Sequence, residues 1–193
     1  MYKNNFKYDL DKSIEESFFP KNKILFLHIK LKTLKIKYSL SYEEITSIII
    51  DTLKVSCPKN IIVPAFTHSF TKNKVFDLYK SNSEVGLFSE LFRKNYSKYR
   101  SFDPIFSLSH LNNYKEQYKN INFLSAFNKN SIWEYFNNSN DTIIVNIGLD
   151  HLITSQIHYI EYICNVPYRS EIIKKGSIID NKINININYN FYA

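Results

Sequence analysis

Hydrophobic residues occur in two kinds of pattern along the chain. Residues 23–28, 60–66 and 141–148 are apolar at nearly every position, which predicts strands that are covered on both faces of a sheet. In stretches such as 45–53, apolar residues recur at helical spacing instead, which predicts amphipathic helices. Because strands and helices alternate, the sequence predicts an α/β fold in which helices flank a mostly parallel central sheet.

Several predicted helices are marked by a polar residue at the start. Ser41 is followed by Glu44, and this spacing predicts a capping box on a helix that ends near residue 57. Residues 67–82, 94–104 and 112–122 show no clear period and are predicted to form loops. The remaining helices are predicted over residues 11–16, closed by residues 18–20, and over residues 83–93, 131–136 and 155–163.

The chain of 193 residues has the length of one domain. Residues 1–20 mix charged and aromatic residues and are expected to form an N-terminal extension. Residues 177–193 are expected to form an atypical, shortened C-terminal end. Within that end, isoleucine and asparagine alternate over 183–188, which predicts a half-buried strand.

The net charge of +7 does not by itself indicate nucleic-acid binding. The lysines are scattered along the chain, and arginine occurs only at Arg93, Arg100 and Arg169, so the sequence has no concentrated basic block. A mildly positive field does favour an anionic ligand. We therefore expect a small anionic ligand and no nucleic-acid partner.

Cysteine usage and hydropathy narrow the class further. Cys57 and Cys164 have neither the spacing of a disulfide framework nor that of a zinc site. The sequence lacks a signal peptide and an apolar segment of about 20 residues. We expect a cytoplasmic protein that holds no metal and has no membrane partner.

The signatures of most cofactor-dependent enzymes are missing from the sequence, including phosphate-binding glycine loops, GxSxG and HExxH. A helical pair remains, His158 and Glu161, whose spacing of three residues places both side chains on one face. A carboxylate beside an imidazole fixes its tautomer and raises its basicity, which suits a general base near neutral pH. The same spacing also occurs in solvent-exposed helical ion pairs, so the pair alone leaves both interpretations open.

Several short motifs follow one another in a specific order. They are Pro-Ala-Phe-Thr at 64–67, Phe-Asp at 76–77, a helix with Ser83, Gly86 and Phe-Arg at 92–93, Arg-Ser-Phe-Asp-Pro at 100–104, Ser-Gln-Ile-His-Tyr-Ile-Glu at 155–161, and Val-Pro-Tyr-Arg at 166–169. In this order the chain resembles the aminoglycoside 3-N-acetyltransferase family over about residues 20–176. The resemblance implies a single acyltransferase-like domain that transfers an acetyl group from acetyl-CoA to an amine.

The resemblance also implies roles for individual residues. His158 matches the helix histidine that acts as base, with Glu161 beside it. Asp103 and Asp150 are expected near the acceptor, although a turn or helix-cap role is an alternative for Asp150. The acceptor would be an amino sugar or an aminoglycoside, and a homodimer is left open. The residues expected to meet the coenzyme are His28, Thr67, Ser69, Arg100, Ser101 and Ser107.

The chain departs from the family pattern at two places that bear on function. Residues 28–31 read His-Ile-Lys-Leu where the family usually has His-Ser-Ser-Leu, so two hydroxyls are missing near the expected coenzyme site. Asp103 replaces a histidine, as in relatives associated with bacterial surface polysaccharide synthesis. Three functions therefore remain open: acetylation of such a sugar, aminoglycoside resistance, and a truncated or degenerate member that only binds a ligand or partner.

Overall fold

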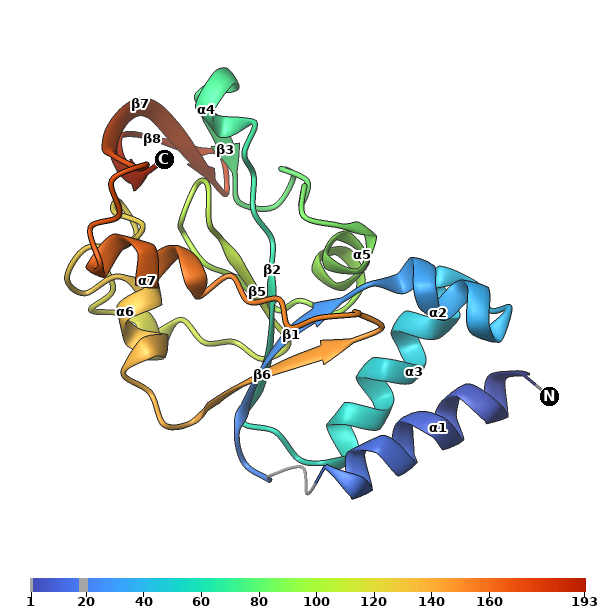
Figure 1. The fold of residues 1–193 in the computed structure, drawn as a ribbon. Coiled ribbons are helices and arrows are strands. Elements are labelled where there is room, and N and C mark those ends of the chain that lie inside the picture. Colours follow the sequence, from blue (N-terminus) through green and yellow to red (C-terminus); the bar gives the residue numbers. More distant parts are fainter. Residues whose placement is uncertain (1, 18–20) are drawn as a thin grey trace.

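The computed structural model describes residues 2–17 and 21–193. Its central sheet contains, in spatial order, β4 (Tyr99–Arg100), β5 (Leu108–His110), β2 (Asn60–Pro64), β1 (Ile24–Ile29) and β6 (Thr142–Ile147) (Figure 1). Strands β2, β1 and β6 run parallel, whereas β5 and β4 are antiparallel to their neighbours. The α/β class is as predicted, but the sheet is mixed, and the prediction of a mostly parallel sheet was wrong.

The antiparallel part of the sheet has a simple cause. The chain leaves β4 and returns in β5 after only residues 101–107. A parallel pair needs a crossover of a dozen or more residues, usually through a helix, so a link this short gives an antiparallel pair. The strands themselves are too short to show a hydrophobic period in the sequence.

Alternate residues of β1 face two hydrophobic cores, as the pleat of a strand requires. Leu25 and Leu27 pack with one group of helices: α1 (Tyr2–Glu16), α2 (Leu31–Tyr38), α3 (Tyr42–Val55) and α5 (Leu87–Asn95). Ile24 and Phe26 pack on the opposite side with α6 (Ile132–Asn137), α7 (Ile157–Ile163) and the C-terminal strands. Figure 1 shows these two groups on either side of the sheet.

The predicted helix caps were largely correct. The Ser41 hydroxyl accepts the N–H of Glu44 at 3.1 Å, and the Glu44 carboxylate accepts the N–H of Ser41 at 3.0 Å, which confirms the capping box of α3. Ser131 caps α6 in the same way through the N–H of Glu134. In contrast, α5 starts at Leu87 with Gly86 as its N-cap, four residues later than predicted.

Other elements were missed or placed differently. Helix α2 follows β1 directly and was not predicted. Helix α1 begins at Tyr2, whereas a helix was predicted only over 11–16, and its predicted end at 18–20 lies outside the described residues. The predicted loops contain α4 (Phe70–Asn73), β3 (Val75–Asp77) and a 3₁₀-helix, η1 (Glu116–Tyr118).

The C-terminal end forms a long hairpin of β7 (Glu171–Asp180) and β8 (Ile183–Tyr192), which joins β3 in a second sheet. Asn181 and Lys182 both have positive φ values, of 45° and 73°. Two such residues make the mirror-image turn that fits the twist of a tight hairpin. The predicted strand at 183–188 is therefore the first part of β8, but the prediction that it is half-buried was wrong, because Ile187 is buried and the other five residues are exposed.

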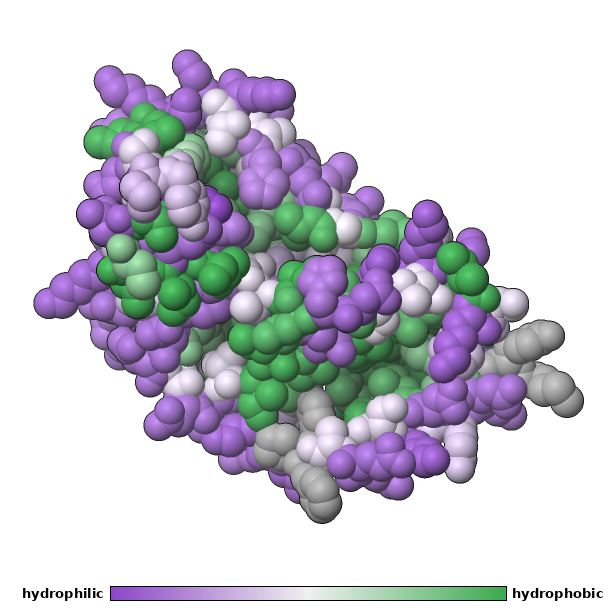
Figure 2. All heavy atoms as spheres, viewed as in Figure 1, coloured by the Kyte–Doolittle hydropathy of each residue, from purple (hydrophilic) through white to green (hydrophobic). Residues whose placement is uncertain are grey.

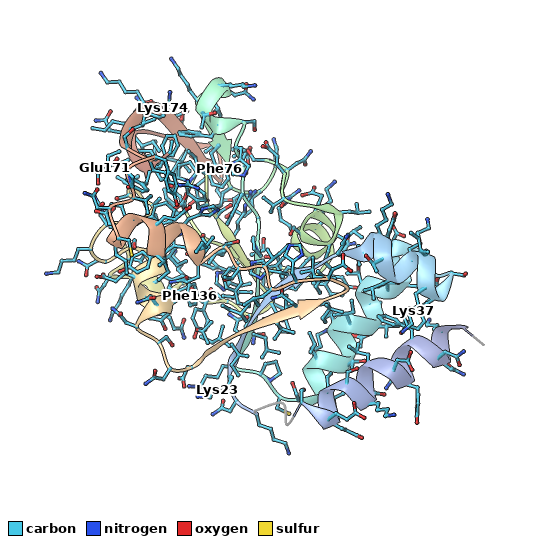
Figure 3. The ribbon with its side chains drawn as sticks, viewed as in Figure 1. Lys23, Lys37, Phe76, Phe136, Glu171 and Lys174 are labelled. Carbon is cyan, nitrogen blue, oxygen red and sulfur yellow. The ribbon has the colours of Figure 1, made fainter. Side chains whose placement is uncertain are left out.

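Polar and apolar side chains separate as expected for a folded domain. Phe76 and Phe136 are buried in the core, whereas Lys23, Lys37 and Lys174 lie toward the outside (Figure 3). Apolar side chains also reach the surface over β6 and α7, where Ile144 and Ile160 are partly exposed (Figure 2). Within residues 2–17 and 21–193, none of the helices combines the length and the apolar character that a membrane span needs.

Candidate active site

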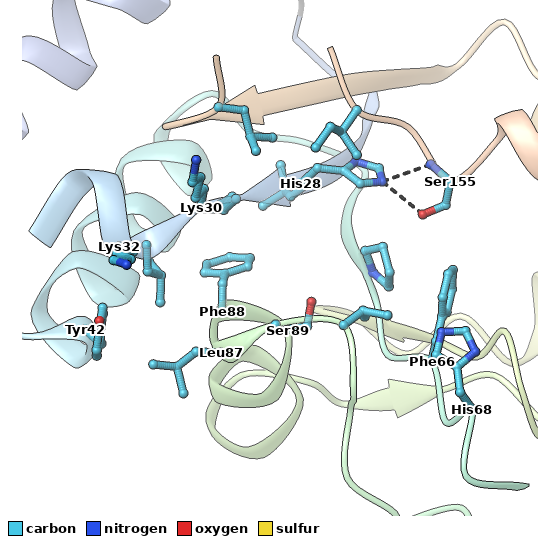
Figure 4. Close-up of a pocket in the computed structure, with 18 of the residues that line it drawn as sticks. His28, Lys30, Lys32, Tyr42, Phe66, His68, Leu87, Phe88, Ser89 and Ser155 are labelled. Atoms are coloured by element: carbon cyan, nitrogen blue, oxygen red, sulfur yellow. Dashed lines mark hydrogen bonds between the residues drawn. The ribbon is translucent and has the colours of Figure 1, made fainter. Parts of the chain in front are cut away.

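A cleft of about 550 Å³ opens at the carboxyl ends of β1 and β2 (Figure 4). Ligands of open α/β sheets bind at this edge, because the loops that follow parallel strands meet there. The lining comes from residues in four segments, 27–32, 64–68, 85–89 and 149–158, together with Tyr42. The cleft thus joins the starts of α2, α5 and α7 to the ends of two strands.

The two sides of the cleft differ in chemistry. Lys30 and Lys32 lie on one side, beside the start of α2, while His28, Ser155 and His68 lie on the other (Figure 4). The start of a helix presents free N–H groups and a partial positive charge, so this lysine side suits an anion. The other side presents imidazole and hydroxyl groups, which can exchange hydrogen bonds with a bound ligand.

Two glycines shape the backbone around the cleft. Gly148 has a φ of 70°, and a Cβ at this position would lie 2.8 Å from the carbonyl oxygen of Lys30. A side chain is therefore excluded where the chain leaves β6 and crosses the start of α2. Gly86 has a φ of 120° at the N-cap of α5, a conformation that favours glycine.

His28 lies at the end of β1 and connects this strand to the start of α7. Its Nε2 atom accepts the backbone N–H of Ser155 at 3.1 Å, and the Ser155 hydroxyl lies at the same distance (Figure 4). An acceptor at Nε2 requires the proton on Nδ1. Burial lowers the pKa of His28 to about 4, so the ring is neutral at physiological pH. His28 therefore acts in this arrangement as a neutral link between two elements.

His158 lies in the first turn of α7 and contributes to the cleft lining. Its Nδ1 atom is 3.2 Å from Oε2 of Glu161, one turn further along the helix. Arg169 also contacts this carboxylate, with Nη2 at 3.0 Å from Oε2, and the Tyr168 hydroxyl donates to Oε1 at 3.1 Å. The predicted pair of His158 and Glu161 is thus brought together, and it forms part of a cluster of four side chains.

The environment of Glu161 keeps its carboxylate ionised. Partial burial raises its pKa, but the hydrogen bonds from His158 and Tyr168 and the charge of Arg169 outweigh that effect. The net pKa lies below the ordinary value for glutamate. An ionised carboxylate can accept a hydrogen bond from Nδ1–H of the neutral imidazole, and Nε2 then keeps its free lone pair.

Arg100 lies away from the cleft and is buried. Its Nε atom donates to the Ser107 hydroxyl at 3.0 Å, and Nη1 donates to the Ser81 carbonyl at 2.5 Å. Its Nη2 atom donates to the Ala65 carbonyl at 2.6 Å and to the Thr67 hydroxyl at 2.8 Å. Burial lowers the pKa of Arg100 to about 9. The guanidinium therefore joins three separate segments of the chain to one another.

Asp103 is also interior, with 1% of its surface exposed. Its Oδ1 atom accepts the N–H groups of Ile105 and Phe106, at 2.9 and 2.6 Å, and the Tyr189 hydroxyl at 2.7 Å. Burial raises the pKa of Asp103 to about 6, although the three hydrogen bonds oppose this shift. Asp103 thus connects the β4–β5 loop to β8.

The residues predicted to meet the coenzyme or acceptor separate into two groups. His28 and His158 line the cleft, whereas Thr67, Arg100, Ser101, Ser107 and Asp103 are buried and do not. Ser101 accepts the Leu108 N–H at 2.8 Å, and Ser107 donates to the Ala65 carbonyl at 2.7 Å. These five side chains bond to the protein itself, so in this arrangement they are not available to a bound ligand.

Ser69 and Asp150 lie near the cleft without lining it. The backbone N–H of Ser69 donates to the Glu84 carboxylate at 3.0 Å. The exposed Asp150 forms an ion pair with Lys30 at 3.3 Å, at the lysine side of the cleft. Asp150 is therefore closer to the expected anionic ligand than to the histidine side.

Sequence reasoning missed several residues of the cleft. Ser155 belongs to the motif at 155–161, but no role was predicted for it. Lys30 precedes helix α2 and Lys32 lies in its first turn, and this helix was not predicted. His68 is exposed and also lines the cleft, and no role was predicted for it. His110 is fully buried in β5 and does not line the cleft.

The chain was compared with known families, curated proteins and solved structures. A sequence profile described as aminoglycoside 3-N-acetyltransferase matches residues 51–190. The search of curated proteins found no match. The comparisons give no support to a link with surface polysaccharide synthesis.

Solved structures resemble the whole fold at low sequence identity. AAC-VIa bound to sisomicin has 12% identity and a TM-score of 0.74, over 97% of this chain and 76% of that one. AAC-IIIb in binary complex with CoASH has 12% identity and a TM-score of 0.74, over 97% and 75%. The YokD protein from Bacillus subtilis has 15% identity and a TM-score of 0.67, over 96% and 81%.

The profile covers well over half of the sequence, and the fold of the chain matches that of these structures. The resemblance seen in the short motifs is therefore confirmed at the level of the family. The chain belongs to the aminoglycoside 3-N-acetyltransferase family, a family of acyl-CoA-dependent N-acyltransferases.

Proposed function

We propose that this chain transfers an acetyl group from acetyl-CoA to an amino group of an amino sugar or aminoglycoside, with His158 as general base. The observation that carries the proposal is the position of His158. It lines the cleft while its Nδ1 atom lies 3.2 Å from the Glu161 carboxylate. This arrangement leaves Nε2 as the nitrogen that can take a proton.

The lysine side of the cleft fits the anionic part of the coenzyme. Lys30 and Lys32 supply positive charge, and the start of α2 supplies backbone N–H groups, so both features favour phosphate. Lys30 stands at one of the two positions where the family usually has serine, which suggests that charge replaces a missing hydroxyl. The known complex of AAC-IIIb with CoASH agrees with a coenzyme site in this fold.

The thioester carbonyl of acetyl-CoA is already activated, so the protein needs only to position the amine and take its proton. His158 holds the attacking amine and takes its proton at Nε2 as the new C–N bond forms. Glu161 stabilises the imidazolium that results. When the C–S bond breaks, CoA leaves as a thiolate that takes this proton back from the imidazolium, so the products are the N-acetylated amine and the CoA thiol. The acceptor amine attacks directly, so a covalent enzyme intermediate is not needed. His28, which is neutral and bonded to Ser155, keeps α7 in place beside the cleft.

The acceptor class rests on what relatives bind. AAC-VIa binds sisomicin, and a variant of AAC(3)-IVa has been solved in complex with a gentamicin. Both ligands are aminoglycosides, so amino sugars are the first class to test. A degenerate chain that only binds a ligand is the alternative, since the inward-facing Arg100 and Ser107 leave the coenzyme fewer partners than the motifs suggest.

The first experiment is calorimetry with acetyl-CoA and with CoA, followed by mass spectrometry of acetylated amino sugars and aminoglycosides. Mass spectrometry is preferable to a thiol reagent because Cys57 and Cys164 are both exposed and would react. Micromolar coenzyme binding with turnover supports the proposal. The absence of binding at millimolar coenzyme would support the degenerate alternative.

The decisive variant is His158→Ala. Loss of a general base lowers the rate by about 10²–10⁴-fold, and coenzyme affinity should change little. His151→Ala is a matched control, because His151 is exposed and precedes the same helix. Turnover by His158→Ala at the wild-type rate would refute the assignment of the base.

A further inference from the structure

The segment after α7 folds back against the helix through a defined backbone motif. Asn165 has a φ of 47° directly after the C-cap, Cys164. The N–H of Val166 donates to the Glu161 carbonyl at 3.3 Å, and the N–H of Asn165 donates to the Tyr162 carbonyl at 3.0 Å. These two bonds form a Schellman motif, which ends a helix and reverses the chain.

The reversal returns two side chains to the helix that the chain has just left. Residues 166–169 run back beside α7, and Tyr168 and Arg169 reach the two oxygens of the Glu161 carboxylate. The Tyr192 hydroxyl donates to the Val166 carbonyl at 3.0 Å and fixes this returning segment to β8. Arg169 is therefore held beside Glu161 by the backbone on one side and by the second sheet on the other.

Arg169 also lies close to the histidine itself. Its Nη2 atom is 3.3 Å from Nδ1 of His158, whereas it is 3.0 Å from Oε2 of Glu161. A guanidinium can only donate, so a bond to Nδ1 would require the proton of the neutral imidazole to be on Nε2. In that tautomer His158 could not act as base at Nε2. Which of the two acceptors Arg169 uses therefore decides whether the histidine is competent.

We propose that Arg169 is a positioning residue that selects the active tautomer of His158 by holding the Glu161 carboxylate against Nδ1. Arg169 has hydrogen-bond geometry toward Nδ1 of His158 at 3.3 Å and forms an ion pair with Glu161 at 3.0 Å. The formal negative charge and the shorter distance favour the carboxylate over the neutral ring nitrogen as its partner. Nδ1–H of His158 then donates to the same carboxylate, and Nε2 keeps its lone pair for the acceptor amine. This inference rests on the proposed role of His158 as base.

The proposal makes an unusual prediction for variants at the two positions. In Glu161→Ala, Arg169 loses its carboxylate and donates to Nδ1, which fixes the inactive tautomer. In the double variant Glu161→Ala/Arg169→Met, this donor is gone, and His158 is free to adopt both tautomers. The double variant should therefore be faster than Glu161→Ala, by about tenfold, although it lacks more of the site. A purely structural role for Arg169 predicts the opposite order.

The single substitution supplies the second measurement. Arg169→Met should lower turnover by about 10- to 100-fold, because the orientation of the base is lost, and Arg169→Lys should recover part of this loss. Arg93→Lys, which changes an arginine in another pair with a glutamate, is the matched control and should keep wild-type turnover. Wild-type turnover by Arg169→Met, or a double variant slower than Glu161→Ala, would overturn the proposal.

A spectroscopic readout separates this inference from the proposed function. The ¹⁵N shifts of His158 distinguish its two neutral tautomers without any turnover. The wild-type chain should show the proton on Nδ1, and Glu161→Ala should show it on Nε2. If the wild-type chain is inactive yet shows this change, the proposed function fails while the positioning role stands. If His158→Ala abolishes turnover but the tautomer is the same in wild type and Glu161→Ala, the positioning role fails alone.

Discussion

Two clusters in this protein are built from similar side chains, yet they differ in what they can do. One joins Arg100, Ser107 and Thr67 in the interior, and the other joins Arg169, Glu161 and His158 at the cleft. In the first, each nitrogen of the guanidinium donates to a carbonyl or hydroxyl of the protein itself. In the second, one ring nitrogen of the histidine remains for a ligand. Exposure, rather than residue type, separates a cluster that is closed to a ligand from one that a ligand can reach.

The largest expected effect tests this contrast directly. Arg100→Met leaves buried acceptors in three segments without a donor, and we expect it to lower the free energy of unfolding by about 3–5 kcal/mol. Arg169→Met removes a partly exposed ion pair and should cost about 1 kcal/mol or less. Urea denaturation of both variants measures the difference. Equal losses would show that the two clusters do not differ in this way.

The second prediction concerns pH and sharpens the description of the interior. Burial lowers the pKa of His110 to about 3 and that of His28 to about 4, so the unfolded chain binds more protons than the folded chain below about pH 6.5. Each histidine therefore makes stability rise with pH between about 4.5 and 6.5, by up to roughly 1.4 kcal/mol per pH unit. Asp103 acts in the opposite direction up to about pH 6, since its folded pKa is raised.

The net slope of these three groups is positive, and two variants separate the contributions. His110→Gln should flatten the rise of stability with pH, and Asp103→Asn should steepen it. The exposed His151→Gln is the control and should leave the slope as it is. Unfolding free energies at several pH values give the answer. A free energy of unfolding of the wild-type chain that falls as the pH rises through this window would contradict the effect assigned to the buried histidines.

The smallest expected effect distinguishes a structural carboxylate from a ligand contact. Tyr189→Phe removes one buried hydrogen bond to Asp103 and should cost about 1 kcal/mol of unfolding free energy. Asp103→Asn should cost less, because all three donors meet Oδ1, which asparagine retains. The KM for the acceptor should not change in Asp103→Asn. A clear rise in that KM would instead support the prediction from the sequence that Asp103 contacts the acceptor.

Much of the central fold could be predicted because its signals are local. The apolar runs of β1, β2 and β6 are continuous, and Ser41 with Glu44 marks the start of α3. Helix α2 could not be found in this way, since it follows β1 without a cap residue and is rich in lysine. Strand β4 has only two residues, too few for any period, so neither the strand nor its pairing with β5 could be read from the hydrophobic pattern.

The candidate site also contains residues with a local signal in the sequence and residues without one. His158 and Glu161 are three residues apart, and helical geometry alone brings them together. Arg169 reaches them only because Asn165 reverses the chain, a detail that no periodicity reveals. Arg100 and Asp103 were assigned to ligands because burial cannot be read from a short motif. Their polar side chains serve the interior, where Arg100 donates to the Ala65 carbonyl and Asp103 accepts from the Tyr189 hydroxyl.

The three arginines of this lysine-rich sequence share one property, the number of partners that each side chain contacts. Among 25 basic residues other than histidine, only Arg93, Arg100 and Arg169 are arginine, and each uses its guanidinium on two or more partners. A lysine offers one nitrogen on a flexible stem and cannot reproduce a planar fork. A lysine at any of these three positions would therefore keep the charge but lose at least one of the contacts that the guanidinium makes. The rare arginines mark the places where the protein uses the planar geometry of the side chain as well as its charge.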